Sequence, residues 1–319
     1  MDRQNAIDEL VALRGEYLRD RAIFVPGGRL IPILRALGAQ ESDFAALRQT
    51  SEGLVGDPTL PFRRTRNGRF AFDLANSRIK RLEPQPFVLS AAEDFIRHDS
   101  GKPRVFDPIG LELQDNTVMQ ALLRFKCLIV RDTRVEPRPH FDYDHDLWIC
   151  TLFNIRTVTV PRLRGEPSLE GVHSDGVDHT MTTFLGSENI TTASGVTYMH
   201  DMTETTGIPW EQADPQRVRG SVRHQEFLDT LVLVDHERKH SVSSVYAEDP
   251  DAVAKRDMLI FFTRKPVVAG HVSKPFDSTR EHDEEPLSLQ IPVDLTEPSL
   301  PREAKWESAP TGPVPTALR

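Results

Sequence analysis

Residues 170–176 read EGVHSDG, and this short stretch carries the strongest structural signal in the chain. His173 and Asp175 are one residue apart, so on a β-strand they project from the same face and can reach one metal ion together. A further histidine, His240, follows the apolar run of residues 231–234. Two histidines and one carboxylate on one face of an ion suit non-haem Fe(II) and leave coordination positions open. The stretch therefore predicts a closed sheet in which a later strand supplies the third ligand of a metal site.

A second H-x-D pattern, at His140 and Asp142, competes with the first. It lies within residues 139–146, PHFDYDHD, whose density of charge indicates a polar loop that precedes the strands. The first pattern is instead flanked by Gly171 and Gly176, which let the backbone turn closely around an ion. We therefore expect the second pattern to take no part in the site.

The third ligand has two candidates, His236 and His240. Residues 231–235 read as a strand and residues 236–239 as the turn after it. His240 opens the next predicted strand, and a ligand at the mouth of a strand is better fixed than one in a turn. We therefore favour His240.

Short strands dominate the second half of the chain. The predicted strands are residues 148–160, 172–175, 181–185, 195–199, 227–235, 241–246 and 257–262. Many short strands separated by turns, with no helices between them, indicate a sandwich or a barrel.

Helical spacing of apolar residues predicts helices in residues 1–50 and again in residues 115–135. We divide the chain into a helical N-terminal region, residues 1–110, that packs on a barrel, and a catalytic barrel core, residues 111–275. Residues 276–319 form a Pro-rich C-terminal extension, whose apolar segment near Leu289 could pack back as an edge strand.

Composition narrows the classes of partner. A formal net charge of −9 argues against a nucleic-acid partner, because phosphate binding needs a basic surface. No run approaches the ~18 apolar residues of a membrane span, and no export signal is apparent. Cys127 and Cys150 lie in apolar runs and are expected to be buried free thiols. We therefore expect a cytoplasmic protein without a membrane partner.

An Fe(II) ion held by three side chains could also bind a 2-oxoacid through two further positions. The far carboxylate of that cosubstrate would need a cation, and the fork of an arginine matches a carboxylate. Arg256 and Arg264 begin and end one apolar strand with the same parity, roughly 26 Å apart at ~3.3 Å per residue. Only one of them can serve, and their positions alone leave the choice open.

Three motifs in this order resemble a known family. They are EGVHSDG at residues 170–176, DTLVL at 229–233 with HSVS at 240–243, and RDMLI at 256–260. Together they resemble Fe(II)/2-oxoglutarate-dependent oxygenases of the free amino acid hydroxylase type, such as the L-isoleucine 4-hydroxylase family. The resemblance covers about residues 145–265.

This resemblance implies a fold and a set of ligands. The fold is mainly β with flanking helices (α+β), namely a double-stranded β-helix, or jelly-roll and cupin-like barrel. The resemblance assigns Fe(II) to His173, Asp175 and His240, and it assigns the distal carboxylate of 2-oxoglutarate to Arg256.

The resemblance also implies an activity. A small substrate, a free amino acid or a derivative, would be oxidised with dioxygen at an unactivated C–H bond, and hydroxylation is the expected outcome. The same chemistry diverted to oxidative cyclisation or desaturation in secondary metabolism is the first alternative. A cupin-like metal enzyme that needs no 2-oxoglutarate is the second, and a non-catalytic β-sandwich binding module is the third.

Substrate contacts are the least specified part of the site. The chain departs from the family pattern at residues 193–195, Ala-Ser-Gly in place of a Gly-Gly pair, and at residues 152–155, where the family often has Gln-Phe-Arg-Ile. Asn154 in that strand is one candidate contact, and Arg156 and Asp178 are candidates for the carboxylate and the ammonium of an amino acid. Further candidates are Arg124 for the carboxylate and His179 at the pocket mouth.

Overall fold

The computed structural model describes residues 3–93 and 95–292. The helices are α1 (Arg3–Asp20), α2 (Gly27–Ala36), α3 (Glu41–Gln49), α4 (Leu111–Gln114) and α5 (Thr117–Val130). The strands are β1 (Ala22–Val25), β2 (Arg63–Asp73), β3 (Arg78–Leu82), β4 (Leu147–Thr159), β5 (His179–Glu188), β6 (Val196–His200), β7 (Val218–Arg223), β8 (Thr230–Val234), β9 (Lys239–Val242), β10 (Ala254–Arg264) and β11 (Ser288–Gln290).

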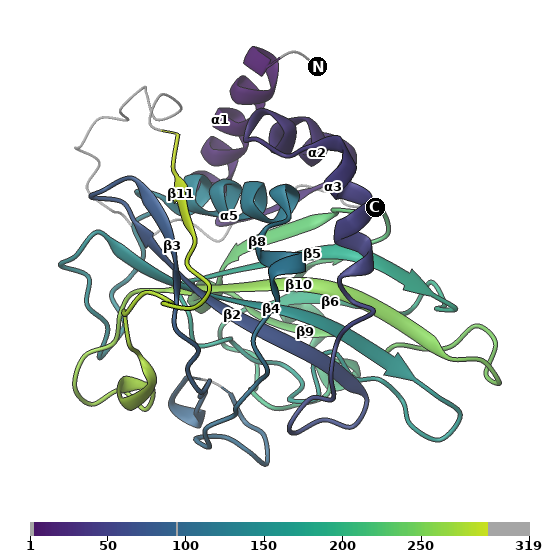
Figure 1. Ribbon diagram of the computed structural model, residues 1–319. Helices are drawn as coiled ribbons and strands as arrows, with labels where there is room; N and C mark the ends of the chain where they lie inside the picture. The colour runs from purple at the N-terminus through teal and green to yellow at the C-terminus, as the bar shows by residue number, and fades with distance from the viewer. Residues whose placement is uncertain (1–2, 94, 293–319) are drawn as a thin grey trace.

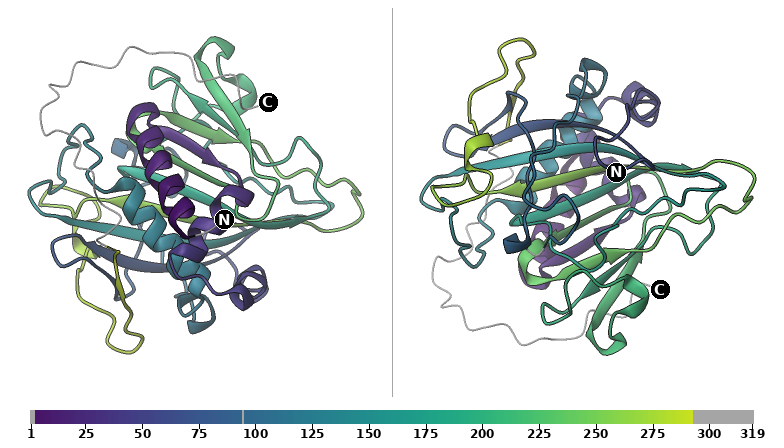
Figure 2. Two further views of the ribbon diagram at one scale, coloured as in Figure 1. Left: turned by 90° about the horizontal axis from the view of Figure 1, so that it is seen from above. Right: turned by 90° about the horizontal axis from the view of Figure 1, so that it is seen from below.

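These strands form two antiparallel sheets. The large sheet has the order β1-β8-β5-β10-β4-β2-β3-β11, and the small sheet has the order β7-β6-β9. The helices gather on one side of the large sheet, and the small sheet lies on its other side (Figures 1 and 2). The predicted fold, a mainly β double-stranded β-helix with flanking helices, is confirmed.

Alternation along two neighbouring strands separates two apolar layers. In β10, Phe261 packs toward the helices, whereas Ile260 and Phe262 face the opposite side of the sheet. In β4, Leu152 joins the helix layer and Phe153 joins the opposite one. Because successive side chains of a strand alternate between faces, one sheet can cover a core with one face and line a cavity with the other.

Helix α5 is the central helix of the covering layer. It begins after Asn116, whose side-chain oxygen accepts hydrogen bonds from the backbone N–H groups of Val118 and Met119 at 3.0 and 3.2 Å. Such a cap satisfies donors that the first turn leaves free. Eleven of its fourteen residues are buried, because it packs against α1 and α2 and shares a core cluster with residues of β4 and β10.

The structure differs from the sequence-based expectation in two segments. Residues 1–110 were expected to be helical, but they also contain β1, β2 and β3, which join the large sheet. These strands are recognised through long-range pairing, such as that of β2 with β4, and not by local periodicity. Residues 172–175 were expected to form a strand, but only His173 makes a β-bridge there.

Other expectations agree with the structure. The edge strand expected near Leu289 is present as β11, paired with β3, and Cys127 and Cys150 are buried free thiols. The rest of the Pro-rich extension, residues 293–319, lies outside the described residues. No helix in the described part of the chain is long and apolar enough to span a membrane.

Helix α5 also carries a buried cation, Lys126. Its side chain is 0% exposed, and its Nζ atom has no hydrogen-bond partner among the described residues. Burial lowers the pKa of this ammonium to about 7. A base whose pKa is lower in the folded state than in the unfolded chain destabilises the fold fully below the folded pKa, and the penalty fades as the pH rises toward the unfolded value.

We predict that Lys126→Met stabilises the protein by about 1–3 kcal/mol near neutral pH, because it removes a buried polar group without a partner. Urea unfolding at pH 6.5 and pH 9.5 should show the larger gain at the lower pH. Lys255→Met is the control, since Lys255 is 31% exposed in its side chain and pairs with Glu188. An equal gain at both values of pH would contradict this account.

Candidate active site

Two backbone hydrogen bonds join His173 directly to His240. His173 lies in the loop between β4 and β5, and His240 lies in β9. The N–H of His173 donates to the carbonyl of His240 at 2.9 Å, and the N–H of His240 donates to the carbonyl of His173 at 2.8 Å. Residues opposite each other in such a pair project their side chains to the same side of the sheet. The bridge therefore brings together two imidazoles that are far apart in the sequence.

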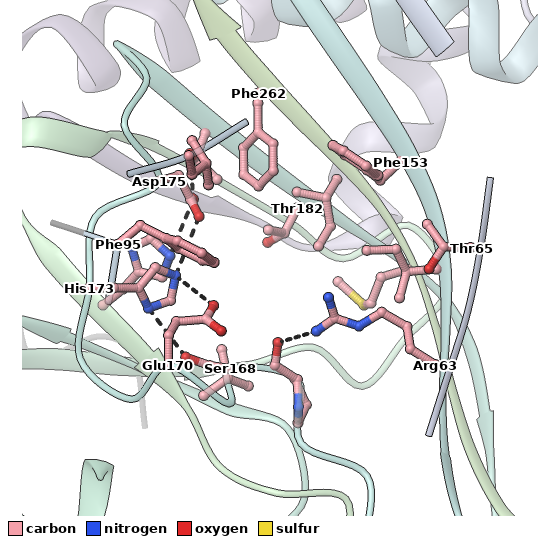
Figure 3. A pocket seen from close by; sticks show the side chains of 18 of the residues that line it. Arg63, Thr65, Phe95, Phe153, Ser168, Glu170, His173, Asp175, Thr182 and Phe262 are labelled. Carbon is pink, nitrogen blue, oxygen red and sulfur yellow. Dashed lines mark hydrogen bonds and ion pairs between the residues drawn. The ribbon is translucent and has the colours of Figure 1, made fainter. Parts of the chain in front are cut away.

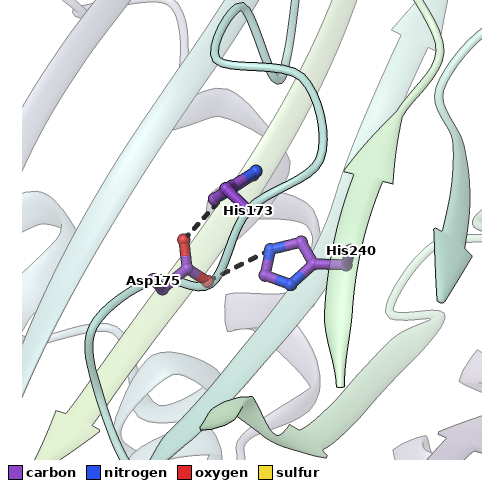
Figure 4. Close-up of side chains that lie close together, drawn as sticks. All are labelled: His173, Asp175 and His240. Carbon is purple, nitrogen blue, oxygen red and sulfur yellow. Dashed lines mark ion pairs between the residues drawn. The ribbon is translucent and has the colours of Figure 1, made fainter. Parts of the chain in front are cut away.

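Asp175 completes a compact cluster with these two histidines (Figure 4). Its Oδ1 lies 3.3 Å from Nε2 of His173, and its Oδ2 lies 3.3 Å from Nε2 of His240. One candidate ligand atom from each residue lies within 4.8 Å of the others, and all three residues are buried. The structure thus brings together the three residues that were predicted to form a metal site.

Hydrogen bonds orient the side chains of this cluster. Nδ1 of His173 lies 2.9 Å from the carbonyl of Gly171, which fixes the proton on Nδ1 and leaves Nε2 free for a metal. The hydroxyl of Thr180, in β5, donates to Oδ2 of Asp175 at 2.8 Å.

Asp235 supports the cluster from behind. It is 0% exposed, and its two carboxylate oxygens accept the backbone N–H of Asp175 at 3.0 and 2.8 Å. Its Oδ1 also lies 3.8 Å from Nδ1 of His240, just beyond hydrogen-bonding distance. Burial and the charge of Asp175 raise the pKa of Asp235 above its usual range.

The electrostatics of the cluster suit a cation. Burial opposes ionisation of Asp175, but the neighbouring His240 and His173 override it and hold the pKa of Asp175 well below its usual range. Glu170 adds a further carboxylate, with Oε1 at 3.3 Å from Nε2 of His173. Two imidazoles, an ionised carboxylate and a fixed tautomer fit a divalent ion such as Fe(II).

The cluster opens into a cavity of about 120 Å³ (Figure 3). Strands of both sheets line it, so it lies between them. One wall is aromatic: the Phe87 ring lies 5.0 Å from that of Phe153 and 5.9 Å from that of Phe262, between ring centroids. Ile155 and Ile260 extend this wall. Such a wall keeps water from the space beside the cluster.

Arg256 lines the cavity, and Arg264 does not. Nη2 of Arg264 donates to Asp277 at 3.0 Å, which occupies its guanidinium. Nη2 of Arg256 reaches the Gly195 carbonyl only at 3.5 Å, the limit of a hydrogen bond. Burial lowers the pKa of Arg256 to about 10, so it stays charged at neutral pH. Of the two candidates for the far carboxylate of a cosubstrate, Arg256 has the free guanidinium.

Gly195 makes room for that guanidinium. Its φ angle is +63°, and a Cβ atom built on it would lie 2.4 Å from Nε of Arg256. Both facts favour glycine at this position.

Charged side chains that the sequence analysis did not single out line another part of the cavity. They are Asp57, Arg63, Arg97, Arg104 and Glu170. Most come from loops without a periodic pattern. The one local signal was Glu170, which is part of the motif that carries the two ligands.

The three predicted substrate contacts do not line the cavity. In β4, Asn154 and Arg156 face the side of the sheet opposite to Phe153, which lines the cavity. Asn154 forms hydrogen bonds with Ser51 and Thr50. Asp178 accepts hydrogen bonds from the Tyr143 hydroxyl and the Lys265 backbone N–H.

Arg156 is likewise occupied, by ion pairs with Asp257 at 2.7 Å and Glu52 at 2.8 Å. The other two candidates also lie away from the cavity. Arg124 donates to the carbonyls of Leu37 and Gln290, and the buried His179 lies 2.8 Å from the Tyr17 hydroxyl. These five assignments are corrected: as the structure has them, none of these side chains can contact a molecule in the cavity.

The competing histidines lie apart from the cluster. His140 is exposed, with Nδ1 at 3.2 Å from the carbonyl of Ala269, and Asp142 pairs with His145. His236 lies in the 3₁₀ turn Asp235–Glu237 and is not part of the group around His173.

The fold and the site agree with a comparison to known families. The family model described as 2OG-Fe dioxygenase matches residues 48–262, more than half of the chain. The chain belongs to this family. Enzymes of this family are non-haem iron dioxygenases that use Fe(II) and 2-oxoglutarate. The alternatives without 2-oxoglutarate, a cupin-like enzyme and a non-catalytic module, are therefore not retained.

Individual relatives support the family. The bifunctional enzyme flvA of Aspergillus flavus is 47% identical over 286 residues, which is 90% of this chain and 35% of that protein. The chain thus spans about a third of the length of this curated relative. The solved Fe(II)/α-ketoglutarate-dependent dioxygenase TqaL is 48% identical, with a TM-score of 0.79 over 91% of this chain and 97% of that one.

A more distant structure, IDO from Bacillus thuringiensis, shares the fold. It is 14% identical, with a TM-score of 0.60 over 80% of this chain and 95% of that one.

We predict that Asp235→Asn weakens metal binding by about 10- to 100-fold, as loss of a carboxylate behind the ligands commonly does. The amide keeps the shape but removes the charge next to His240 and one acceptor for the Asp175 N–H. Equilibrium dialysis with Co(II) would measure the affinity. Asp251→Asn, at an exposed position, is the control. Unchanged affinity in Asp235→Asn would show that this carboxylate does not support the ligands.

Proposed function

We propose that this dioxygenase holds Fe(II) with His173, Asp175 and His240, holds the distal carboxylate of 2-oxoglutarate with Arg256, and hydroxylates an unactivated C–H bond of a free amino acid or a close derivative. One observation carries the proposal: the buried His-Asp-His cluster and a buried arginine without a carboxylate partner line the same cavity. No ion pair to Arg256 is found within residues 3–93 and 95–292.

The overall reaction balances as follows. One 2-oxoglutarate, one dioxygen and one C–H substrate give succinate, carbon dioxide and the C–OH product. Bound Fe(II) supplies the activation of dioxygen, and 2-oxoglutarate supplies two electrons. The side chains of this chain position the reactants: Arg256 orients the cosubstrate, and the aromatic wall formed by Phe87, Phe153 and Phe262 excludes water.

Two features support an amino acid as the substrate. The cavity presents carboxylates and guanidinium groups beside an aromatic wall. A molecule with an ammonium, a carboxylate and a compact apolar side chain complements all three surfaces. The motifs of the chain also resemble those of free amino acid hydroxylases.

We predict that His173→Ala, Asp175→Ala and His240→Ala each abolish succinate formation and lose bound metal, because removing one of three ligands unbalances both charge and geometry. Metal content after dialysis, measured by mass spectrometry, and far-UV circular dichroism would separate ligand loss from unfolding.

His236→Ala and His140→Ala are the matched controls for these three variants, and we expect both to retain metal and activity. Loss in His236→Ala with full activity in His240→Ala would show that the wrong distal histidine was chosen. Loss of bound metal in His140→Ala would require all three ligands to be reassigned.

We predict that Arg256→Ala raises the concentration of 2-oxoglutarate needed for half-maximal turnover by about one to two decades, since hydrogen bonds to charged groups contribute about 1.5–3 kcal/mol. Arg256→Lys should recover part of the loss, because an ammonium does not reproduce the fork. Metal affinity should stay unchanged. Arg264→Ala is the control, and an effect confined to that variant would reject the assignment.

Product mass decides between the outcomes of the reaction. Hydroxylation adds one oxygen atom to the substrate, whereas desaturation or oxidative ring closure removes two hydrogen atoms. A product two mass units lighter than the substrate would replace the hydroxylation proposal with the alternative and leave the assignment of the ligands and of Arg256 intact.

A further inference from the structure

Arg104 is a buried cation with unused donors. The residue is 7% exposed, and its Nε and Nη2 atoms have no hydrogen-bond partner among the described residues. Its guanidinium lies 5.1 Å from the centre of the Phe87 ring and 5.2 Å from that of Phe95. The carboxylate of Asp99 approaches Nε only to 3.8 Å. The rings of Phe87 and Phe95 thus flank the planar guanidinium of Arg104 at the cavity, but they offer it no hydrogen-bond acceptor.

Asp99 is engaged by a different arginine. Nε and Nη2 of Arg97 donate to its two oxygens at 2.5 and 2.6 Å. This bidentate pair uses the geometry that a guanidinium and a carboxylate favour. Arg97 is therefore neutralised, whereas Arg104 next to it is not.

Glu170 supplies the opposite charge on the same cavity. Its side chain is 9% exposed. Its Oε2 lies 3.9 Å from Nη1 of Arg97, too far for a hydrogen bond, and has no hydrogen-bond partner in the described part of the chain. Its other oxygen lies 3.3 Å from Nε2 of His173, and Figure 3 shows the carboxylate extending into the cavity beside that histidine. A donor bound by Glu170 would lie next to the metal cluster.

The surroundings of Arg104 and of Arg256 are separate. Arg104 is enclosed by Phe87, Phe95 and Asp99. The groups that act on Arg256 are Gly195, Arg223 and Asp257. Arg104 and Arg256 are thus separate guanidinium groups of the cavity, neither of which hydrogen-bonds to a carboxylate of the described residues, and one cosubstrate carboxylate satisfies only one of them.

We propose that Arg104 binds the α-carboxylate of the substrate and that Glu170 binds its α-ammonium, so that the substrate is a zwitterionic α-amino acid. This inference rests on the proposed function and adds the residues that recognise the substrate. In this arrangement the ammonium lies next to His173, the carboxylate lies at the guanidinium of Arg104, and the side chain faces the aromatic wall.

The test compares variants of Arg104 and Glu170 with ligands that lack the group each residue is proposed to bind, the carboxylate or the ammonium. The six L-amino acids alanine, valine, leucine, isoleucine, methionine and phenylalanine are first tested for binding, by anaerobic equilibrium dialysis with and without Fe(II) and 2-oxoglutarate. Each one that binds is then compared with its amide, which lacks the carboxylate, and with its des-amino acid, which lacks the ammonium. Succinate formation with each ligand is measured in parallel.

Arg104→Gln should weaken binding of the amino acid by about 10- to 100-fold and should abolish its preference over the amide. Glu170→Gln should abolish the preference over the des-amino acid. Arg104→Lys should fall between Arg104→Gln and the native chain. Arg64→Gln, at an exposed arginine outside the cavity, should change nothing, and thermal melting would check that each variant is folded.

Three outcomes would overturn the proposal: none of the six amino acids binds, the variants keep both preferences, or Arg104→Gln weakens 2-oxoglutarate binding instead. These are distinct from failure of the proposed function, in which the native chain binds no 2-oxoglutarate and forms no succinate. Dialysis without cofactors would decide the amino acid site even then. If Arg104→Gln does not fold, the Glu170→Gln arm decides, and retained preference for the ammonium would reject the pair.

Discussion

The candidate site depends on one backbone contact, the pair of hydrogen bonds between His173 and His240. His240 belongs to the small sheet through β9, whereas His173 belongs to a loop that leads from β4 to β5 of the large sheet. The bridge therefore fixes the small sheet to the loop at the point where three candidate ligands meet. A loop alone would leave His173 and Asp175 free to move. Pairing with a strand gives them the rigidity that a metal site requires.

The sequence predicted those parts of the site that depend on residues a few positions apart. The H-x-D pair, the opening position of His240 in its strand and the common parity of Arg256 and Arg264 are all short-range features. The face of β4 that lines the cavity was not predictable, because β4 is buried on both faces along most of its length. A strand of this kind lacks the polar–apolar alternation that identifies an inner face, so Asn154 was assigned to the wrong side.

Arg104 was missed for a different reason. It lies in a long segment between β3 and α4 with little regular structure, where neither helical nor strand periodicity gives the direction of a side chain. Its significance comes from contacts with Phe87 and Phe95 and from two donors that find no hydrogen-bond acceptor among the described residues, and both depend on the folded chain. Two buried guanidinium groups without carboxylates also carry a desolvation cost. Ligands that supply the missing carboxylates would offset this cost, so the empty protein is less stable than the loaded one.

Gly195 lies in the turn before β6 and Arg256 lies in β10, yet the two residues are in close steric contact. The left-handed backbone at Gly195 brings its Cα so near the guanidinium that any side chain at this position would collide with it. Replacement of the arginine by a shorter residue would remove the collision and also the cation. A side chain at position 195 would therefore displace the guanidinium of Arg256 and, with it, any carboxylate that this arginine binds.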